Sequence, residues 1–164
     1  KEKMMILLFN SKDIVFGISS ENIQEITRMI KIDYFPSEKG IIESVINYRG
    51  STIPVVDSLK YLKKNKGTYD KDSIIIILNI HHELVGMLAD DVKQTIEIES
   101  NSIERYQIAE SDYFNSFIKL ENKIYPLLNI ERVSRDIKRA VIISWQVPEA
   151  IVLRTISPPD KGKS

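Results

Sequence analysis

The chain has 164 residues, 43% of them hydrophobic and 28% charged, and its 23 basic residues match its 23 acidic residues. That length suits one domain able to bury its core without a metal or a disulfide, and the balanced charge argues against a nucleic-acid binder, whose affinity comes largely from phosphate neutralisation. The absence of cysteine excludes thiolate zinc sites, thiol catalysis and disulfides. The sequence shows no signal-peptide pattern and no apolar run long enough to cross a bilayer, which predicts a cytoplasmic location without membrane insertion.

The N-terminal part predicts a β-hairpin followed by a short helix. Two apolar runs, at residues 5–9 and 14–18, flank a polar turn cluster, as in a hairpin. Ser20 can then cap a short helix, because its side chain can accept from the free amides of the first turn. Ile23 and Ile26 are three residues apart and would share one face of that helix.

A second hairpin is predicted around Arg49 and Gly50, which lie between apolar runs at residues 41–46 and 51–57. Gly50 supplies the positive φ that a tight turn needs. A short helix follows and is expected to end at Gly67.

The second half predicts the strongest strand, at residues 73–80. Its unbroken β-branched content indicates burial on both faces. His81 and His82 turn the chain back into a strand at residues 84–89, and the alternation at 94–99 is typical of a half-exposed strand.

A last hairpin is predicted across Glu121 and Asn122, between residues 113–120 and 123–130. The sequence therefore predicts nine or ten short strands with short helices and no long amphipathic helix, which favours closed all-β packing. Residues 137–164 are interpreted as a C-terminal extension that is partly disordered, since its end is rich in proline and charge.

The sequence does not predict a catalytic or metal site. His81 and His82 are the only histidines and fit a solvent-facing turn better than a metal site. Asp90 and Asp91 have no third carboxylate at a ligand-like spacing, and the six glycines form no phosphate-binding loop. We therefore predict a protein that binds other molecules and has no catalytic residue, cofactor or metal.

Five collinear segments resemble CheW-like domains, and together they cover about residues 4–134. The sequence Asn-Tyr-Arg-Gly at 47–50, for example, is similar to the Asn-Leu-Arg-Gly hairpin of that family. The five segments are residues 14–26, 47–50, 53–57, 84–92 and 127–130.

The chain departs from the family pattern at three positions. Ser44 stands where the family usually has glycine, Tyr48 replaces the common leucine, and Asp91 lies where a small residue is frequent. These departures affect the expected choice of partners more than the expected fold.

The resemblance implies an all-β fold of two SH3-like five-stranded β-barrels packed side by side, with an apolar groove between them. Residues 1–136 would form this domain. It implies a chemotaxis adaptor without catalytic activity that binds the regulatory domain of the histidine kinase CheA on one surface. The groove would accept the helical-hairpin tip of a methyl-accepting chemoreceptor.

Six positions carry over from the family as partner-binding residues. Ile23 and Ile74 would make apolar contacts in or beside the groove, although both could equally be core residues. Glu25 and Arg49 would make polar contacts that distinguish between partners, unless Arg49 is a solvated hairpin tip. The full set is Ile23, Glu25, Ser44, Arg49, Ile74 and Thr95.

Other functions remain open from the sequence. The same domain could belong to a CheA-type kinase or a CheV-type protein. From another class, a nucleic-acid-binding small β-barrel is possible, although the zero net charge and the lack of a basic and aromatic surface argue against it. An enzyme is the weakest alternative.

Overall fold

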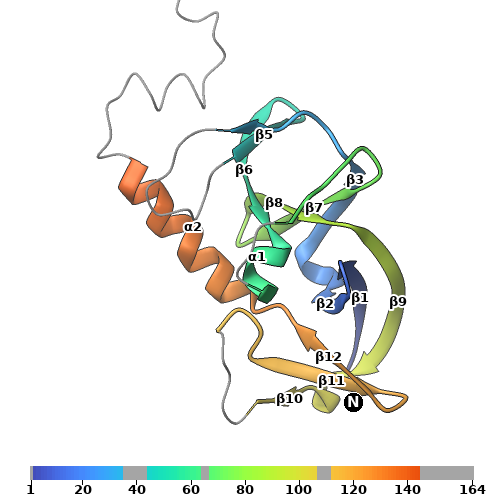
Figure 1. The fold of residues 1–164 in the computed structure, drawn as a ribbon. Coiled ribbons are helices and arrows are strands. Elements are labelled where there is room, and N and C mark those ends of the chain that lie inside the picture. The colour runs from blue at the N-terminus through green and yellow to red at the C-terminus, as the bar shows by residue number, and fades with distance from the viewer. Residues whose placement is uncertain (1, 35–43, 64–66, 107–111, 145–164) are drawn as a thin grey trace, which may run out of the picture.

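The structure is a computed structural model that describes residues 2–34, 44–63, 67–106 and 112–144, without the side chains of residues 63 and 139–144. In this part of the chain, twelve strands form two six-stranded sheets, and one long helix lies along one side of both (Figure 1). We call the two sheets sheet A and sheet B. Each forms one lobe of the molecule.

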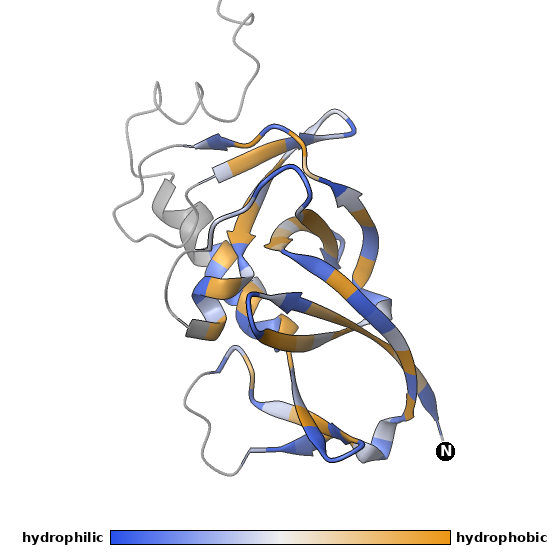
Figure 2. Cartoon of the chain, turned by 45° about the vertical axis from the view of Figure 1, so that its right-hand side comes forward, coloured by the Kyte–Doolittle hydropathy of each residue, from blue (hydrophilic) through white to orange (hydrophobic). Residues whose placement is uncertain are grey.

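Sheet A combines strands from both ends of the chain in the order β10-β11-β12-β2-β1-β9. Its strands are β1 (Lys3–Ser11), β2 (Ile14–Ser19), β9 (Asp91–Glu99), β10 (Glu104–Arg105), β11 (Ser116–Leu120) and β12 (Lys123–Leu127). The edge strand β9 curves strongly, and its residues alternate between hydrophilic and hydrophobic (Figure 2). Ile96 and Ile98 are half-buried and their neighbours are exposed, which confirms the predicted half-exposed strand.

Sheet B is made by the middle of the chain in the order β3-β7-β8-β6-β5-β4. Its strands are β3 (Ile23–Arg28), β4 (Asp33–Tyr34), β5 (Ser44–Tyr48), β6 (Ser51–Asp57), β7 (Ile74–Ile80) and β8 (Glu83–Ala89). Each sheet thus has five strands of five or more residues and a two-residue edge strand, β10 or β4. The prediction of an all-β protein with two five-stranded barrel lobes is confirmed.

Three tight turns connect the hairpins where the sequence predicts them, at residues 49–50, 81–82 and 121–122. Both residues of each pair have positive φ, between 50° and 86°, as two-residue type I′ turns require. Four of these six positions are occupied by Arg, His or Glu, which adopt a positive φ less readily than Gly or Asn. The backbone is therefore locally strained at these positions, and the turn gives the hairpin the correct twist.

The predicted helix containing Ile23 and Ile26 is wrong. A three-residue 3₁₀ turn, η1 (Ser20–Asn22), is followed directly by β3, which pairs with β7. The turn has no side-chain cap; its N-cap is Ser19, not Ser20. Pairing with β7 is favoured over a helix because Ile23 and Ile26 are β-branched and bury their side chains against that strand.

The short helix after β6 is confirmed as α1 (Ser58–Lys63), and a second 3₁₀ turn, η2 (Ser100–Ser102), follows β9. The expectation of no long helix is wrong, because α2 (Ile130–Ser144) has 15 residues. Helix α2 runs through the predicted domain boundary at residue 136, and that boundary stays a prediction. Residues 145–164, where disorder is predicted, lie outside the described residues.

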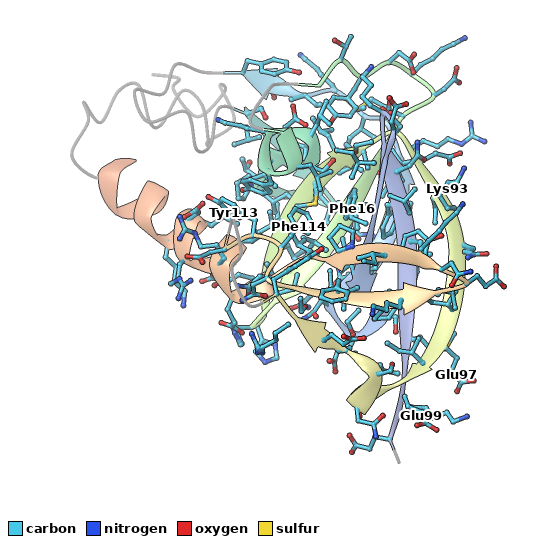
Figure 3. The ribbon with its side chains drawn as sticks, turned by 60° about the horizontal axis from the view of Figure 1, so that its bottom comes forward. Phe16, Lys93, Glu97, Glu99, Tyr113 and Phe114 are labelled. Carbon is cyan, nitrogen blue, oxygen red and sulfur yellow. The ribbon has the colours of Figure 1, made fainter. Side chains whose placement is uncertain are left out.

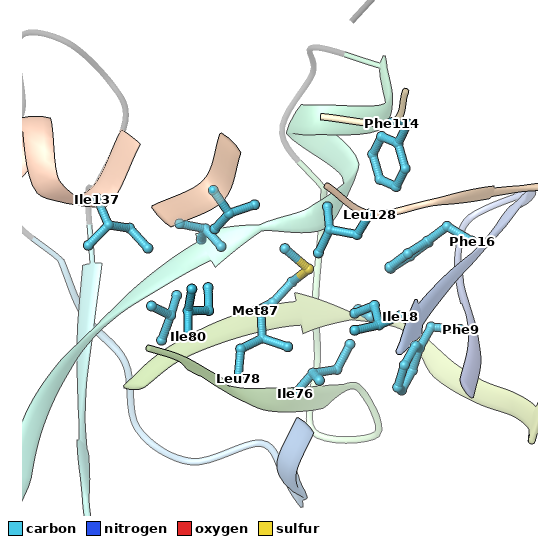
Figure 4. Packing of buried hydrophobic residues seen from close by; sticks show 14 residues of the cluster. Phe9, Phe16, Ile18, Ile76, Leu78, Ile80, Met87, Phe114, Leu128 and Ile137 are labelled. Carbon is cyan, nitrogen blue, oxygen red and sulfur yellow. The ribbon is translucent and has the colours of Figure 1, made fainter. Parts of the chain in front are cut away.

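One large group of buried side chains, which we call the shared core, joins the two lobes and helix α2 (Figure 4). Its members are Phe9, Phe16, Ile18, Val56, Ile76, Leu78, Ile80, Val85, Met87, Ala89, Phe114, Leu128, Val133 and Ile137. Alternate residues of β7 point into it, while Ile75 and Ile77 point into a separate core of sheet B. Burial of β7 on both faces, as predicted, is confirmed.

Candidate partner-binding surfaces

The first candidate surface lies at the edge of the shared core, where four half-buried apolar side chains from both sheets pack against it. We call this set the junction rim. It consists of Leu7 on β1, Ile23 and Ile26 on β3, and Ile74 on β7. The register places Ile23 opposite Leu78, and Ile74 opposite Arg28, so the two predicted residues lie at opposite ends of the β3–β7 pair.

Thr95 borders the junction rim from sheet A. It lies directly opposite Leu7 in the β1–β9 pairing, so the two side chains share one face of the sheet. Met5 and Glu97 form the next pair on that face, and Met5 is 42% exposed. Figure 3 shows Glu97 and Glu99 projecting from β9 at the surface. The rim is thus apolar at its centre, with polar and acidic side chains along β9.

The expected apolar groove between the lobes stays a prediction. The lobes are packed together through the shared core, whose members are at most 9% exposed. Among the described residues, the half-buried rim is the apolar surface at the edge of that core that a partner can reach.

The second candidate surface is a group of three hydrogen-bonded side chains that we call the polar cluster: Glu25, Tyr48 and Arg49. The hydroxyl of Tyr48 donates to Glu25 Oε1 at 2.5 Å, and Arg49 Nη2 donates to the same oxygen at 2.8 Å. The guanidinium carbon of Arg49 lies 5.3 Å from the centre of the Tyr48 ring. The side chains of Arg49 and Glu25 are 71% and 35% exposed, whereas Tyr48 is buried.

The polar cluster favours the ionised form of Glu25. The hydrogen bond from Tyr48 is the main cause that lowers the pKa of Glu25, and the charge and hydrogen bond of Arg49 act in the same direction against partial desolvation. The cluster thus presents a carboxylate and a guanidinium side by side on the surface.

The two candidate surfaces lie on opposite faces of sheet B. Glu25 is paired with Ile77, which points into the core of sheet B, whereas Ile26 is paired with Ile76, which points into the shared core. Paired residues share a face and successive residues alternate. The structure therefore brings Glu25 and Arg49 together and places Ile23 and Ile74 on the opposite face of sheet B. Thr95 lies on sheet A.

Ser44 joins neither surface. It is 6% exposed at the start of β5, and its hydroxyl donates to the carbonyl of Val55 on β6 at 3.4 Å. Its role in binding stays a prediction. The structure adds Tyr48 to the site, a residue that the sequence marks only as a departure from leucine.

A third cluster attaches helix α2 to the lobes. The rings of Tyr61 and Tyr113 stack with centres 4.1 Å apart, and the hydroxyl of Tyr113 donates to Asp136. Arg132 Nε lies 3.4 Å from Asp136 Oδ1, and the Asp136 side chain is only 4% exposed. Burial raises the pKa of both tyrosines. We call these four residues the α2 anchor, because they join α2 to α1 and to the segment before β11.

The described residues include no group of three or more His, Asp or Glu side chains that could hold a metal ion. His81 and His82 lie exposed in the β7–β8 turn, as predicted, and His81 Nε2 is 2.9 Å from Glu131 Oε2 on α2. Across the described ranges, the helices are too short or too polar to span a membrane.

Two β-barrel lobes around a shared core, with an apolar rim and a polar cluster on opposite faces of one sheet, define a two-lobed binding domain. The family model of the CheW-like domain matches residues 5–138, and the chain belongs to this family. Its relatives include chemotaxis proteins and a scaffolding protein, and the chain is a chemotaxis scaffold or adaptor.

Relatives agree with this assignment. The chain is 22% identical over 140 residues to the chemotaxis protein CheW of Klebsiella aerogenes, covering 83% of this chain and 84% of that one. It is 26% identical over 136 residues to CheW of Bacillus subtilis, covering 80% and 86%. The crystal structure of the scaffolding protein TtCheW from Thermoanaerobacter tengcongensis superposes with a TM-score of 0.70 at 28% identity, over 78% of this chain and 90% of that chain.

Proposed function

We propose that this chain acts in the cytoplasm as an adaptor that couples chemoreceptors to a CheA-type histidine kinase by binding both. One observation carries the proposal: residues predicted from the family to bind partners lie on opposite faces of sheet B. Glu25 contacts Arg49 on one face, and Ile23 and Ile74 pack against the shared core on the other. An adaptor needs two such surfaces, because its two partners must be bound at the same time. The role needs no catalytic residue.

The junction rim is the surface proposed for the receptor. A helical-hairpin tip presents apolar side chains at intervals of three and four residues, which suit a line of half-buried apolar contacts. Ile23 and Ile74 offer such contacts at the two ends of the β3–β7 pair, and Thr95 lies opposite Leu7, the rim residue of sheet A. On β9, Glu97 and Glu99 follow Thr95 and favour a helix with a basic flank at that end, whereas Lys93 lies on the other side of Thr95 along the strand.

The polar cluster is the surface proposed for the regulatory domain of the kinase. An exposed Arg49 beside a half-buried Glu25 gives a fixed arrangement of opposite charges. Such groups set the register and the choice of partner more than the total affinity.

Control of the kinase by the receptor requires a coupling free energy between the two surfaces. Strand β3 contributes to both, since Ile23 lies on the junction rim and Glu25 in the polar cluster. A receptor that shifts β3 at one face therefore changes contacts at the other.

The test is a kinase assay reconstituted with receptor, with and without this protein. We expect kinase activity and its control by receptor ligand to depend on the added protein. If neither changes when the protein is omitted, the adaptor function is wrong.

Single substitutions assign the two surfaces. We expect Thr95→Arg, on an exposed residue, to weaken receptor binding by about tenfold, and Arg49→Ala to weaken kinase-domain binding by a similar factor. Each variant should keep its fold and its affinity for the other partner. Lys119→Ala on β11 of sheet A is the matched surface control and should change neither affinity. Equal effects of both variants on both partners would contradict the assignment of two surfaces.

A further inference from the structure

Tyr48 holds the two charged residues of the polar cluster in place. It is 5% exposed at the end of β5, directly before the turn that carries Arg49. Its hydroxyl donates to Glu25 Oε1, and its ring lies beneath the Arg49 guanidinium. The leucine common in the family at this position could supply neither the hydrogen bond nor an aromatic face.

We infer that Tyr48 is a positioning residue that fixes the geometry of Glu25 and Arg49 and so sets which kinase surface this chain recognises. This inference rests on the proposed function and names a residue that determines specificity at the same site. Because Tyr48 is buried, it acts through the two charged side chains and does not touch the partner itself.

The hydrogen bonds indicate what chemistry the partner must offer. Both donors of the polar cluster converge on Oε1 of Glu25, which leaves Oε2 without a hydrogen bond among the described residues. Arg49 uses only Nη2 in this contact, and its side chain is 71% exposed. The matching partner surface therefore presents a carboxylate to Arg49 and an N–H or O–H donor to Glu25.

Tyr48 also lowers the cost of binding. An exposed arginine and glutamate would otherwise lose side-chain freedom when the complex forms. A ring under the guanidinium and a hydroxyl on the carboxylate restrict both side chains in the free protein. Gln24 Nε2, 3.5 Å from the Tyr48 hydroxyl, and Asn79, which donates to Gln24 at 3.3 Å, extend this support to β7.

The first experiment compares wild-type protein with Tyr48→Phe and Tyr48→Leu in calorimetric binding to the purified regulatory domain of a CheA-type kinase from the same organism. Loss of a hydrogen bond to a charged group predicts about tenfold weaker binding for Tyr48→Phe. Tyr48→Leu, which also loses the ring, should bind more weakly still. Tyr125→Phe on β12 removes a hydroxyl in the other lobe and should bind like wild type.

The second readout separates positioning from a general structural role. Titration of the Glu25 carboxyl by NMR should give a higher pKa in Tyr48→Phe than in wild type, because the donor that chiefly lowers it is gone. The loss of binding on acidification should move to higher pH by the same amount. An unchanged Glu25 titration, or an unchanged affinity despite a shifted titration, would overturn the inference.

A double-mutant cycle keeps the test decisive if one variant folds poorly. Glu25→Gln alone should weaken binding, and adding Tyr48→Phe to it should cost little more, since Tyr48 acts through that carboxylate. Additive losses would show that Tyr48 acts independently and would contradict the inference. Absence of binding by the wild-type protein itself would instead refute the proposed function.

Discussion

The two faces of sheet B are built by different forces. On the junction rim, Ile23 and Ile74 are held by packing against the shared core, so their positions depend on the volume of the side chains behind them. In the polar cluster, Glu25 and Arg49 are held by hydrogen bonds that meet at one carboxylate oxygen. The rim therefore cannot change much without affecting stability, whereas the exposed charges Glu25 and Arg49 can change at a smaller cost to the fold.

The largest expected effect on stability comes from a substitution in the shared core, against which the junction rim packs. Phe16 is fully buried in the shared core, with ring centres 6.0 Å from Phe9 and 5.8 Å from Phe114. Phe16→Ala should lower the free energy of unfolding by about 3–5 kcal/mol, because it removes a large apolar side chain and leaves a cavity. Urea unfolding followed by circular dichroism and by tyrosine fluorescence would measure the loss.

The same experiment shows whether the shared core makes the two lobes one folding unit. We expect a single transition with coincident probes in both the wild type and Phe16→Ala. Ile118→Ala, in the separate core of sheet A, is a matched control that should also destabilise, but without loosening the rim. Two separated transitions in the wild type would contradict the role given to the shared core.

A smaller effect is expected at the α2 anchor, which closes the shared core on the side of the helix. Arg132→Leu leaves the buried carboxylate of Asp136 without its cation, although the hydroxyl of Tyr113 remains. Because the Arg132 side chain is 28% exposed, we expect a loss of about 2 kcal/mol, below the range for fully buried pairs. Thermal unfolding with hydrogen exchange of the α2 amides would measure it.

A double substitution tests whether the loss of stability comes from the unpaired charge. Replacing Arg132 and Asp136 together with leucine removes the charge as well as its partner, so stability should return toward the wild-type value. If Arg132→Leu alone leaves both the stability and the exchange of α2 unchanged, the ion pair does not hold the helix.

The sequence predicts the lobes better than it predicts the helices. The hairpin turns at 49–50, 81–82 and 121–122 are visible because local turn chemistry and flanking apolar runs determine them. The spacing of Ile23 and Ile26 predicts a helix where β3 forms. Pairing with β7, which lies far along the chain, stabilises a strand there instead. Helix α2 could have been predicted, because Ile130, Val133 and Ile137 follow a helical spacing and pack in or against the shared core.

Part of the candidate site can likewise be predicted from the sequence, and part of it cannot. Glu25 and Arg49 follow from the resemblance, and the structure brings them into contact across β3 and the β5–β6 turn. No pattern in the sequence indicates that Tyr48 joins them, since its only signal is the replacement of a leucine. Side-chain hydrogen bonds between distant strands depend on the three-dimensional register, so this part of the site could be found only in the structure.

The smallest expected effect is on stability at acid pH and comes from the polar cluster. The pKa of Glu25 is lower in the folded protein than its ordinary value of 4.5, chiefly because of the hydrogen bond from Tyr48. A carboxyl group with a lowered folded pKa contributes stability above its unfolded pKa, and this contribution is lost as the pH falls through the folded pKa. The stability difference between wild type and Glu25→Gln should therefore be constant above about pH 5 and shrink below about pH 4.5.

Urea unfolding of both proteins between pH 3 and pH 6 would measure that difference, at low salt and again at about 1 M salt, where charges are screened within about 3 Å. Since Arg49 is mostly exposed, salt should weaken its part of the effect, whereas the bond from the buried hydroxyl of Tyr48 should persist. A difference that does not vary with pH would show that Glu25 is not held as a carboxylate by its neighbours. Glu25 and Arg49 would then be no more preorganised than any solvated pair of charges. Only the residues of the junction rim would be held in place by the fold.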